Sequence, residues 1–175
     1  MNYNDFKKTE FYKFFNLNKT KTSIKDDMTE IYFKTGGFQE FIDIIILINK
    51  NNDIIEAKLI IEREWIGNIK NINPFCKDIV KSFISVFTPL NDKNKINKII
   101  ETIWNLKGEN DYILYIKGPE KKQHKLNEKE QKVIDVYLNL IPFTEFKLKS
   151  STFLFRNIKI NKSVKFNIIW KINSK

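Results

Sequence analysis

The chain of 175 residues has one cysteine, one histidine and five glycines, and each scarcity excludes a class of site. With Cys76 alone, the chain cannot form an internal disulfide or a cysteine-based zinc site, and we expect a reducing compartment. The glycines offer no loop that could cradle the phosphates of a nucleotide. The longest apolar run, Ile44 to Ile48, is far shorter than the ~20 residues needed to cross a bilayer.

Residue types that often carry catalysis are poorly placed for it. His124 lies in the basic run 121–125, where we expect a solvated loop rather than an oriented triad histidine. Cys76 falls in the first turn of an expected helix, beside Lys77 and without a second cysteine or a nearby histidine, so we expect it to pack in the core. Residues 1–15 carry scattered charges and lack the apolar block of a signal peptide, which favours the cytoplasm.

The formal charge of +10 favours either nucleic acid as a partner or a lysine-rich solvated surface. The chain is crowded with isoleucine, lysine, asparagine and phenylalanine, which AT-rich codons supply, so lysine is also the most readily supplied surface residue. The position of the charge is therefore more informative than its total. Residues 144–175 hold eight lysines and arginines against one acid, Glu145, so the positive charge is concentrated at the C-terminal end.

Hydrophobic periodicity predicts a single α+β domain over residues 1–175, because no linker rich in proline, glycine or serine divides the chain. The expected helices cover 4–17, 74–87, 92–107 and 127–141, and the first of them, within 1–20, is peripheral. The expected strands cover 29–34, a hairpin at 41–63, 112–117 and three strands within 144–172. Together they predict a mainly antiparallel sheet packed on the central helices. We expect the polar stretch 19–27 to be a loop.

Local signals fix several helix ends. Asn73 and Pro74 provide an N-cap and a first-turn proline for the helix at 74–87. Asn127 and Glu130 can form a capping box at the start of 127–141. Gly108 is placed as the C-cap of the helix at 92–107.

The segments 29–38 and 144–153 are similar in sequence. This similarity predicts that the two halves of the chain contribute equivalent strands to one sheet, with the central helices on its inner face.

Residues 41–63 predict a β-hairpin with a definite register. If Asn51 and Asn52 form a two-residue turn, Ile48 faces Ile55, and every further pair on that face of the ribbon is also apolar. A shift by one residue would turn this whole set outward, so the pattern favours a single register.

Asp43, Glu56 and Lys58 share the opposite face of the expected hairpin. Two carboxylates can hold a divalent ion and a lysine can orient the attacking water, as metal-assisted phosphodiester hydrolysis requires. These residues and the order of elements over 4–117 resemble the core of the PD-(D/E)xK nuclease superfamily. Asp43 takes the aspartate position, and Glu56 and Lys58 take the ExK positions. The resemblance implies a nuclease that uses Mg²⁺ or Mn²⁺ held by Asp43 and Glu56.

The same residues also fit a plain hairpin. In the expected register Asp43 and Glu56 lie about 13 Å apart along the ribbon. Lys58 lies between them, where it would pair diagonally with Asp43 and lie beside Glu56 on a half-solvated face. The strand also continues beyond Lys58 as an apolar run, whereas nucleases of this type tend to turn there into a polar segment.

Nucleic-acid binding by a basic face of the C-terminal sheet is a further alternative. Alternation within 144–172 predicts five lysines on the polar faces of the strands, namely Lys147, Lys149, Lys159, Lys165 and Lys171. The aromatic residues of these strands alternate away from most of the lysines. We therefore expect them in the core rather than as a platform on which bases stack.

The interpretation we favour is a cytoplasmic, non-enzymatic interaction or adaptor module that binds a protein partner without a cofactor. It rests on a well-patterned core and on the lack of converging polar groups in the sequence. The candidate contact residues are Trp65 and Ile66, directly after the hairpin, and Phe11 and Tyr12 in the aromatic N-terminal helix.

Overall fold

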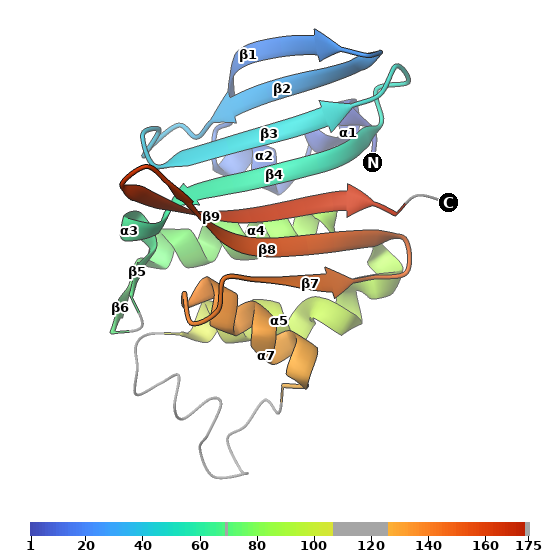
Figure 1. Cartoon of the computed structure of the whole chain (residues 1–175). Helices are drawn as coiled ribbons and strands as arrows, with labels where there is room; N and C mark the ends of the chain where they lie inside the picture. Colours follow the sequence, from blue (N-terminus) through green and yellow to red (C-terminus); the bar gives the residue numbers. More distant parts are fainter. Residues whose placement is uncertain (69, 107–125, 174–175) are drawn as a thin grey trace.

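A seven-stranded antiparallel sheet forms the centre of the protein (Figure 1). The computed structural model describes residues 1–68, 70–106 and 126–173. The strands run in the order β1-β2-β3-β4-β9-β8-β7 across the sheet. Their bounds are β1 Asn18–Lys25, β2 Met28–Lys34, β3 Ile42–Ile48, β4 Ile54–Glu62, β7 Phe143–Lys147, β8 Ser151–Ile160 and β9 Ser163–Ile172. A small separate ribbon pairs β5 (Gly67–Asn68) with β6 (Asn71–Ile72).

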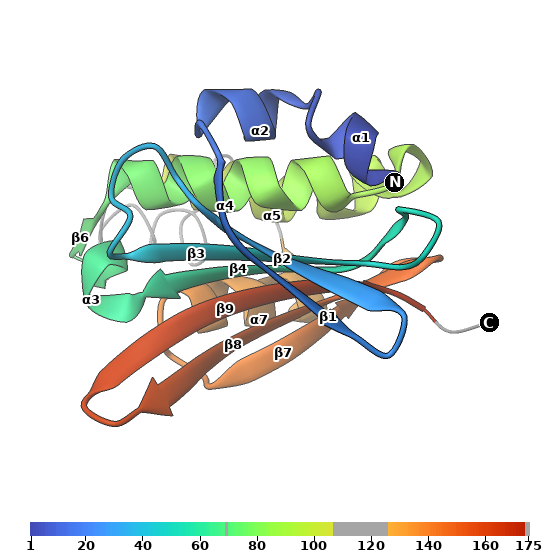
Figure 2. The same ribbon diagram turned by 90° about the horizontal axis from the view of Figure 1, so that it is seen from above.

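The main helices lie on one side of this sheet, and the other side carries no helix of the described chain (Figures 1 and 2). The helices are α1 Tyr3–Phe6, α2 Glu10–Phe14, α3 Arg63–Ile66, α4 Pro74–Phe87, α5 Lys93–Asn105 and α7 Glu128–Tyr137, with a 3-10 turn, η1, at Leu90–Asp92. The α+β fold and the mainly antiparallel sheet expected from the sequence are confirmed.

The predicted capping signals are confirmed at two helix starts. The side chain of Asn73 accepts a hydrogen bond from the N–H of Phe75. Asn127 and Glu130 form a reciprocal capping box at the start of α7. This helix ends at Tyr137 rather than at 141, and Asn139 has a positive φ of 62°. The backbone therefore leaves the helix before the proline that the sequence marks as its limit.

Two predictions for the N-terminal region are wrong. The stretch expected as a loop at 19–27 contains β1, which pairs with β2 at the edge of the sheet. Its side chains are mostly exposed on both faces, so it lacks the alternation that reveals a strand. The single helix expected at 4–17 is two short helices, because Thr9 is the N-cap of α2 and accepts a hydrogen bond from Tyr12. The expected strand at 112–117 and the Gly108 cap lie outside the described residues.

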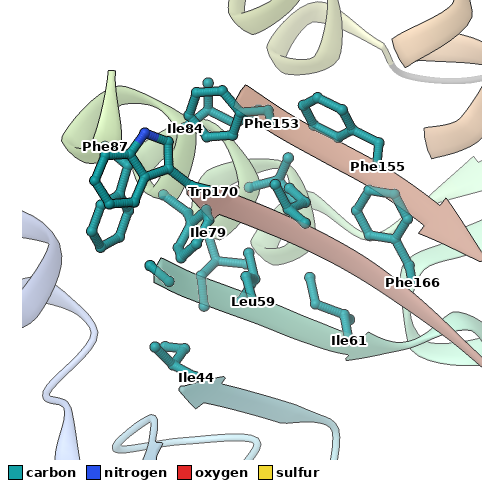
Figure 3. Close-up of a cluster of buried hydrophobic side chains, with 14 of the residues drawn as sticks. Ile44, Leu59, Ile61, Ile79, Ile84, Phe87, Phe153, Phe155, Phe166 and Trp170 are labelled. Atoms are coloured by element: carbon teal, nitrogen blue, oxygen red, sulfur yellow. The ribbon is translucent and has the colours of Figure 1, made fainter. Parts of the chain in front are cut away.

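The core fills the space between the inner face of the sheet and the helices (Figure 3). Alternation along the strands supplies it: the β9 residues Phe166, Ile168 and Trp170 point inward, as predicted, and Asn167 and Ile169 between them are buried on the other face. Ile79 and Phe87 meet them from α4, and the ring of Phe87 lies 5.1 Å from that of Trp170. This continuous apolar layer holds the helices to one side and leaves the opposite face of the sheet open.

The two sequence segments with similar residues occupy equivalent places in this sheet. β2-β3-β4 and β7-β8-β9 are both three-stranded antiparallel meanders, and they meet where β4 pairs with β9. The segments 29–38 and 144–153 supply most of the first strand of each meander. The topology agrees with the expectation that both halves contribute equivalent strands. No described helix is long and apolar enough to span a membrane.

Candidate functional site

The hairpin of β3 and β4 adopts the expected register over most of its length. Six predicted pairs are confirmed, from Ile42 with Ile61 to Leu47 with Glu56. Ile48, however, faces Ile54 rather than Ile55, because a bulge shifts the pairing. The loop spans residues 49–53 and is therefore longer than the expected two-residue turn. Within it, the side chain of Asn49 accepts hydrogen bonds from the N–H groups of Asn51 and Asp53, at 2.9 Å each.

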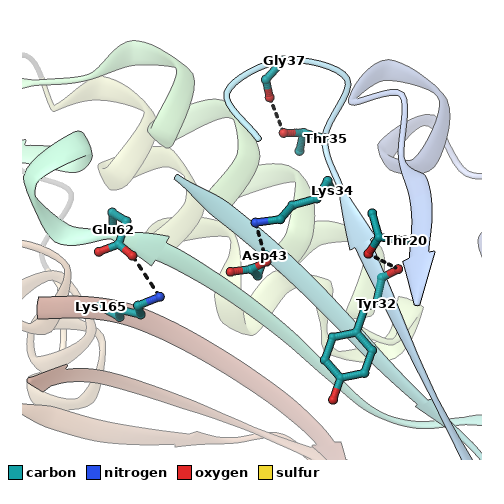
Figure 4. Close-up of polar contacts among 8 residues, drawn as sticks. All are labelled: Thr20, Tyr32, Lys34, Thr35, Gly37, Asp43, Glu62 and Lys165. Carbon is teal, nitrogen blue, oxygen red and sulfur yellow. Dashed lines mark hydrogen bonds and ion pairs between the residues drawn. The ribbon is translucent and has the colours of Figure 1, made fainter. Parts of the chain in front are cut away.

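Asp43, Glu56 and Lys58 lie on the helix-free face; Lys58 lies beside Glu56, as predicted, but Asp43 lies apart from both. Asp43 lies opposite Ile60, and its carboxylate is 2.6 Å from the ammonium group of Lys34 on β2 (Figure 4). The expected pairing of Lys58 with Asp43 is therefore wrong, because the neighbouring strand supplies a nearer lysine.

Lys58 instead pairs with two glutamates. It lies 2.8 Å from Glu56 and 3.8 Å from Glu30 of β2. Tyr32 donates a hydrogen bond of 2.6 Å to Glu30, which raises the pKa of the Tyr32 hydroxyl. Within the described residues, no group of three or more histidine, cysteine, aspartate or glutamate side chains could hold a metal ion.

The five C-terminal lysines do not share a single basic surface. Lys147, Lys165 and Lys171 lie on the helix-free face, whereas Lys159 is opposite Val164 and lies on the other face. Lys165 is 2.9 Å from Glu62, and Lys147 is 3.7 Å from Glu145. The lysine charge on this face is thus largely matched by nearby carboxylates. Lys149 follows β7, and its backbone N–H donates to the buried Asp92.

The four predicted protein-contact residues differ in accessibility. Phe11 and Ile66 are buried in the core, so they support a surface rather than form one. Tyr12 is half-buried and packs edge-on against Phe33. Trp65 is also half-buried, and it stacks on Phe41 with ring centroids 5.3 Å apart.

Cys76 is buried, as predicted, and packs among groups of the core. Burial raises the pKa of its thiol, although the nearby Arg63 opposes this effect. The N-terminal dipole of α4 therefore does not produce a reactive thiolate here. His124 lies outside the described residues.

A hollow in the described surface lies between α2, α4 and α5, a location that the sequence reasoning missed. Its volume is about 520 Å³. Phe14 of α2 is 74% exposed on one side, and Trp104 of α5 is 44% exposed on the other. The ammonium group of Lys81 lies 3.8 Å from the centre of the Trp104 ring. The sequence pattern placed Phe14 on the apolar side of the expected N-terminal helix, and it therefore did not indicate that this side chain is exposed.

A second hollow of about 460 Å³ continues along the end of α4. It shares Thr9, Ser85 and Val86 with the first. At its far end it is lined by Leu90, which is exposed, and by Lys93. We call the two hollows together the α4 groove.

No family model, curated protein or solved structure matches this chain.

Proposed function

We propose that this protein is a non-enzymatic intracellular interaction module that binds a partner protein through the α4 groove. The observation that carries the proposal is the pair of large apolar side chains, Phe14 and Trp104, on the two sides of the groove. Water contacts these rings in the free protein, and burying them beneath a partner would be favourable by roughly 25 cal/mol for each Å² of apolar surface covered.

The shape of the groove fits an amphipathic helix of the partner. Its floor is the outer face of α4, where the small side chains of Ser82 and Ser85 permit close approach. The α4 residues that line the groove run from Asp78 to Phe87, which gives a floor about 15 Å long and matches nearly three turns of a second helix. Aromatic or aliphatic side chains of that helix would pack against Phe14 and Trp104.

The charges along the groove define a preferred partner more closely. Asp78 lies on the first half of α4, whereas Lys93 lies beyond its C-terminal end. A helix with a basic residue near one end and an acidic residue near the other would be matched to both.

The experiment compares proteins recovered by three immobilised forms of the chain: wild type, Phe14→Ser and Ile24→Ser. Ile24 is a matched control because it is 78% exposed on β1, away from the groove. We expect one reproducible partner that binds wild type and Ile24→Ser equally and binds Phe14→Ser at least about tenfold more weakly. The affinities are then measured with the purified partner. Equal binding to all three forms, or no reproducible partner, contradicts the proposal.

A further inference from the structure

Arg156 is a half-buried basic residue on the helix-free face of the sheet, and no described group pairs with it. The ion pairs of this face include Lys34 with Asp43 and Lys165 with Glu62 (Figure 4). Arg156, on β8, has neither a hydrogen-bond partner nor an ion-pair partner for its guanidinium in the part of the chain that the structure describes, and its buried Nε atom is unsatisfied.

The register fixes where Arg156 points. Its neighbours along β8, Phe153 and Phe155, are buried on the inner face, so alternation places Arg156 on the helix-free face. It lies between Asn167 of β9 and Phe143 of β7. Leu154 and Ile158 lie two residues away on the same strand and share its face. The Arg156 side chain is therefore half-buried, with apolar neighbours along its strand and on β7 and with Asn167 opposite it on β9.

An arginine is a rare residue in this chain. Of 31 lysines and arginines, only Arg63 and Arg156 are arginines. Arginine differs from lysine in its planar fork of donors, which can bind two acceptors at once. Arg63 uses that fork within the protein, since it donates to the carbonyls of Tyr137 and Gly67. The guanidinium of Arg156 has no such acceptor among the described residues.

We propose that Arg156 anchors a carboxylate from a partner protein, carried by an aspartate or glutamate within an apolar segment laid across the helix-free face. A guanidinium binds a carboxylate through two parallel hydrogen bonds, and this pairing is strong where apolar neighbours exclude water. Apolar side chains bound the row that contains Arg156 and Asn167, since Phe143 on β7 ends it on one side and Ile60 on β4 on the other, roughly 14 Å across three strand spacings. This span favours a peptide segment over a small acid.

This site is on the opposite side of the sheet from the α4 groove, and neither proposal depends on the other. A carboxylate also fits better than a phosphate group. The lysines nearest to Arg156 on this face, such as Lys165, are already paired with carboxylates, so a single positive charge is left to match.

The test is an NMR titration of the whole protein with the peptide acetyl-Leu-Glu-Leu-amide. Because only two arginines are present, the Nε–Hε signal of Arg156 is identified by its absence in Arg156→Lys. We expect this signal to shift to saturation with the glutamate peptide. The isosteric acetyl-Leu-Gln-Leu-amide should bind at least about tenfold more weakly, because it offers no charge-assisted pair.

Two variants and one small anion complete the design. Arg156→Lys keeps the charge and lacks the fork, so it should also bind the glutamate peptide at least about tenfold more weakly. Because this variant has no Arg156 signal, the affinities of all forms are compared from the backbone amide signals of Leu154 and Ile158 on the same strand. Lys171→Gln removes an exposed charge from the same face and should stay within about twofold of wild type. The proposal is overturned if the wild type binds the glutamate and glutamine peptides with equal affinity, or if Arg156→Lys and Lys171→Gln lose affinity for the glutamate peptide equally. It is also overturned if sodium acetate shifts the Arg156 signal with the same midpoint concentration as the glutamate peptide.

Discussion

Arg63 donates a hydrogen bond to the backbone carbonyl of Tyr137, and this contact joins the end of β4 to the end of α7, 74 residues later. A second hydrogen bond of 3.1 Å reaches the carbonyl of Gly67. Burial lowers the pKa of Arg63, yet no carboxylate balances its charge in the described chain. The negative C-terminal end of the α7 dipole takes that role.

Replacing Arg63 should therefore destabilise the fold. In Arg63→Met, the apolar stem is retained but a buried and a partly buried carbonyl lose their donors, so we expect the free energy of unfolding to fall by about 1–3 kcal/mol. Arg63→Lys should recover only part of this loss, because a lysine cannot span both carbonyls in the same geometry. Urea unfolding measures both values. Lys132→Gln, at an exposed ion pair, is the control, and a loss as large in that variant would contradict the interpretation.

The second prediction concerns the pH dependence that Asp92 gives to stability. Its carboxylate accepts hydrogen bonds from the ammonium group of Lys95 at 2.9 Å and from the N–H of Lys149 at 3.2 Å. The contact with Lys95 is the main cause of its lowered pKa. Because the folded pKa lies below the unfolded one, the contribution is complete above the ordinary aspartate value of about 3.9 and is lost as the pH falls through the folded value.

Asp92→Asn should thus be less stable than wild type at pH 7, by an amount that stays constant down to about pH 5 and narrows below about pH 4. Urea unfolding at pH 7, 5 and 3 provides the measurement. Glu145→Gln, on an exposed strand, should show almost no difference at any of these values. If the difference in the free energy of unfolding between wild type and Asp92→Asn is the same at pH 3 as at pH 7, the charge of Asp92 does not stabilise the fold.

The third prediction is that the thiol of Cys76 is inert in the folded protein. Burial hinders access and raises the thiol pKa, so the reactive thiolate is scarce at pH 8. Labelling with Ellman's reagent should be slow without denaturant and complete within seconds in concentrated urea. Without denaturant, the labelling rate should rise as the free energy of unfolding falls, so a destabilised variant such as Arg63→Met should be labelled faster than wild type. Rapid labelling of the native protein would show that the Cys76 thiol is accessible to the reagent, which would contradict this prediction.

The fourth prediction separates an ion-pair network from a nuclease site. We expect no cleavage of DNA or RNA with Mg²⁺ or Mn²⁺, because Asp43 is paired with Lys34 and separated from Glu56. Glu56→Ala and Lys58→Ala should each change the free energy of unfolding by less than about 1 kcal/mol, as is usual for partly exposed pairs. Metal-dependent cleavage by wild type that disappears in both variants would instead establish the enzyme.

The sequence by itself determined much of the local structure. The N-caps at Asn73 and Asn127 follow from side-chain hydrogen bonds to N–H groups only two or three residues away. Six pairs of the β3-β4 hairpin follow from the apolar alternation, because any other register would expose isoleucines. These features depend on interactions within a short length of chain, so a single sequence contains the information needed to predict them.

Only the tertiary structure decided which distant groups meet. Asp43 forms an ion pair with Lys34 rather than with Lys58, because β2 lies beside β3. The sequence of a single strand does not reveal which strand will lie next to it. The edge strand β1 lacks an apolar pattern and exists because β2 offers it hydrogen bonds. The α4 groove and the unmatched Arg156 likewise arise from packing between elements far apart in sequence. Long-range packing therefore determined the candidate sites, while local chemistry determined the elements that carry them.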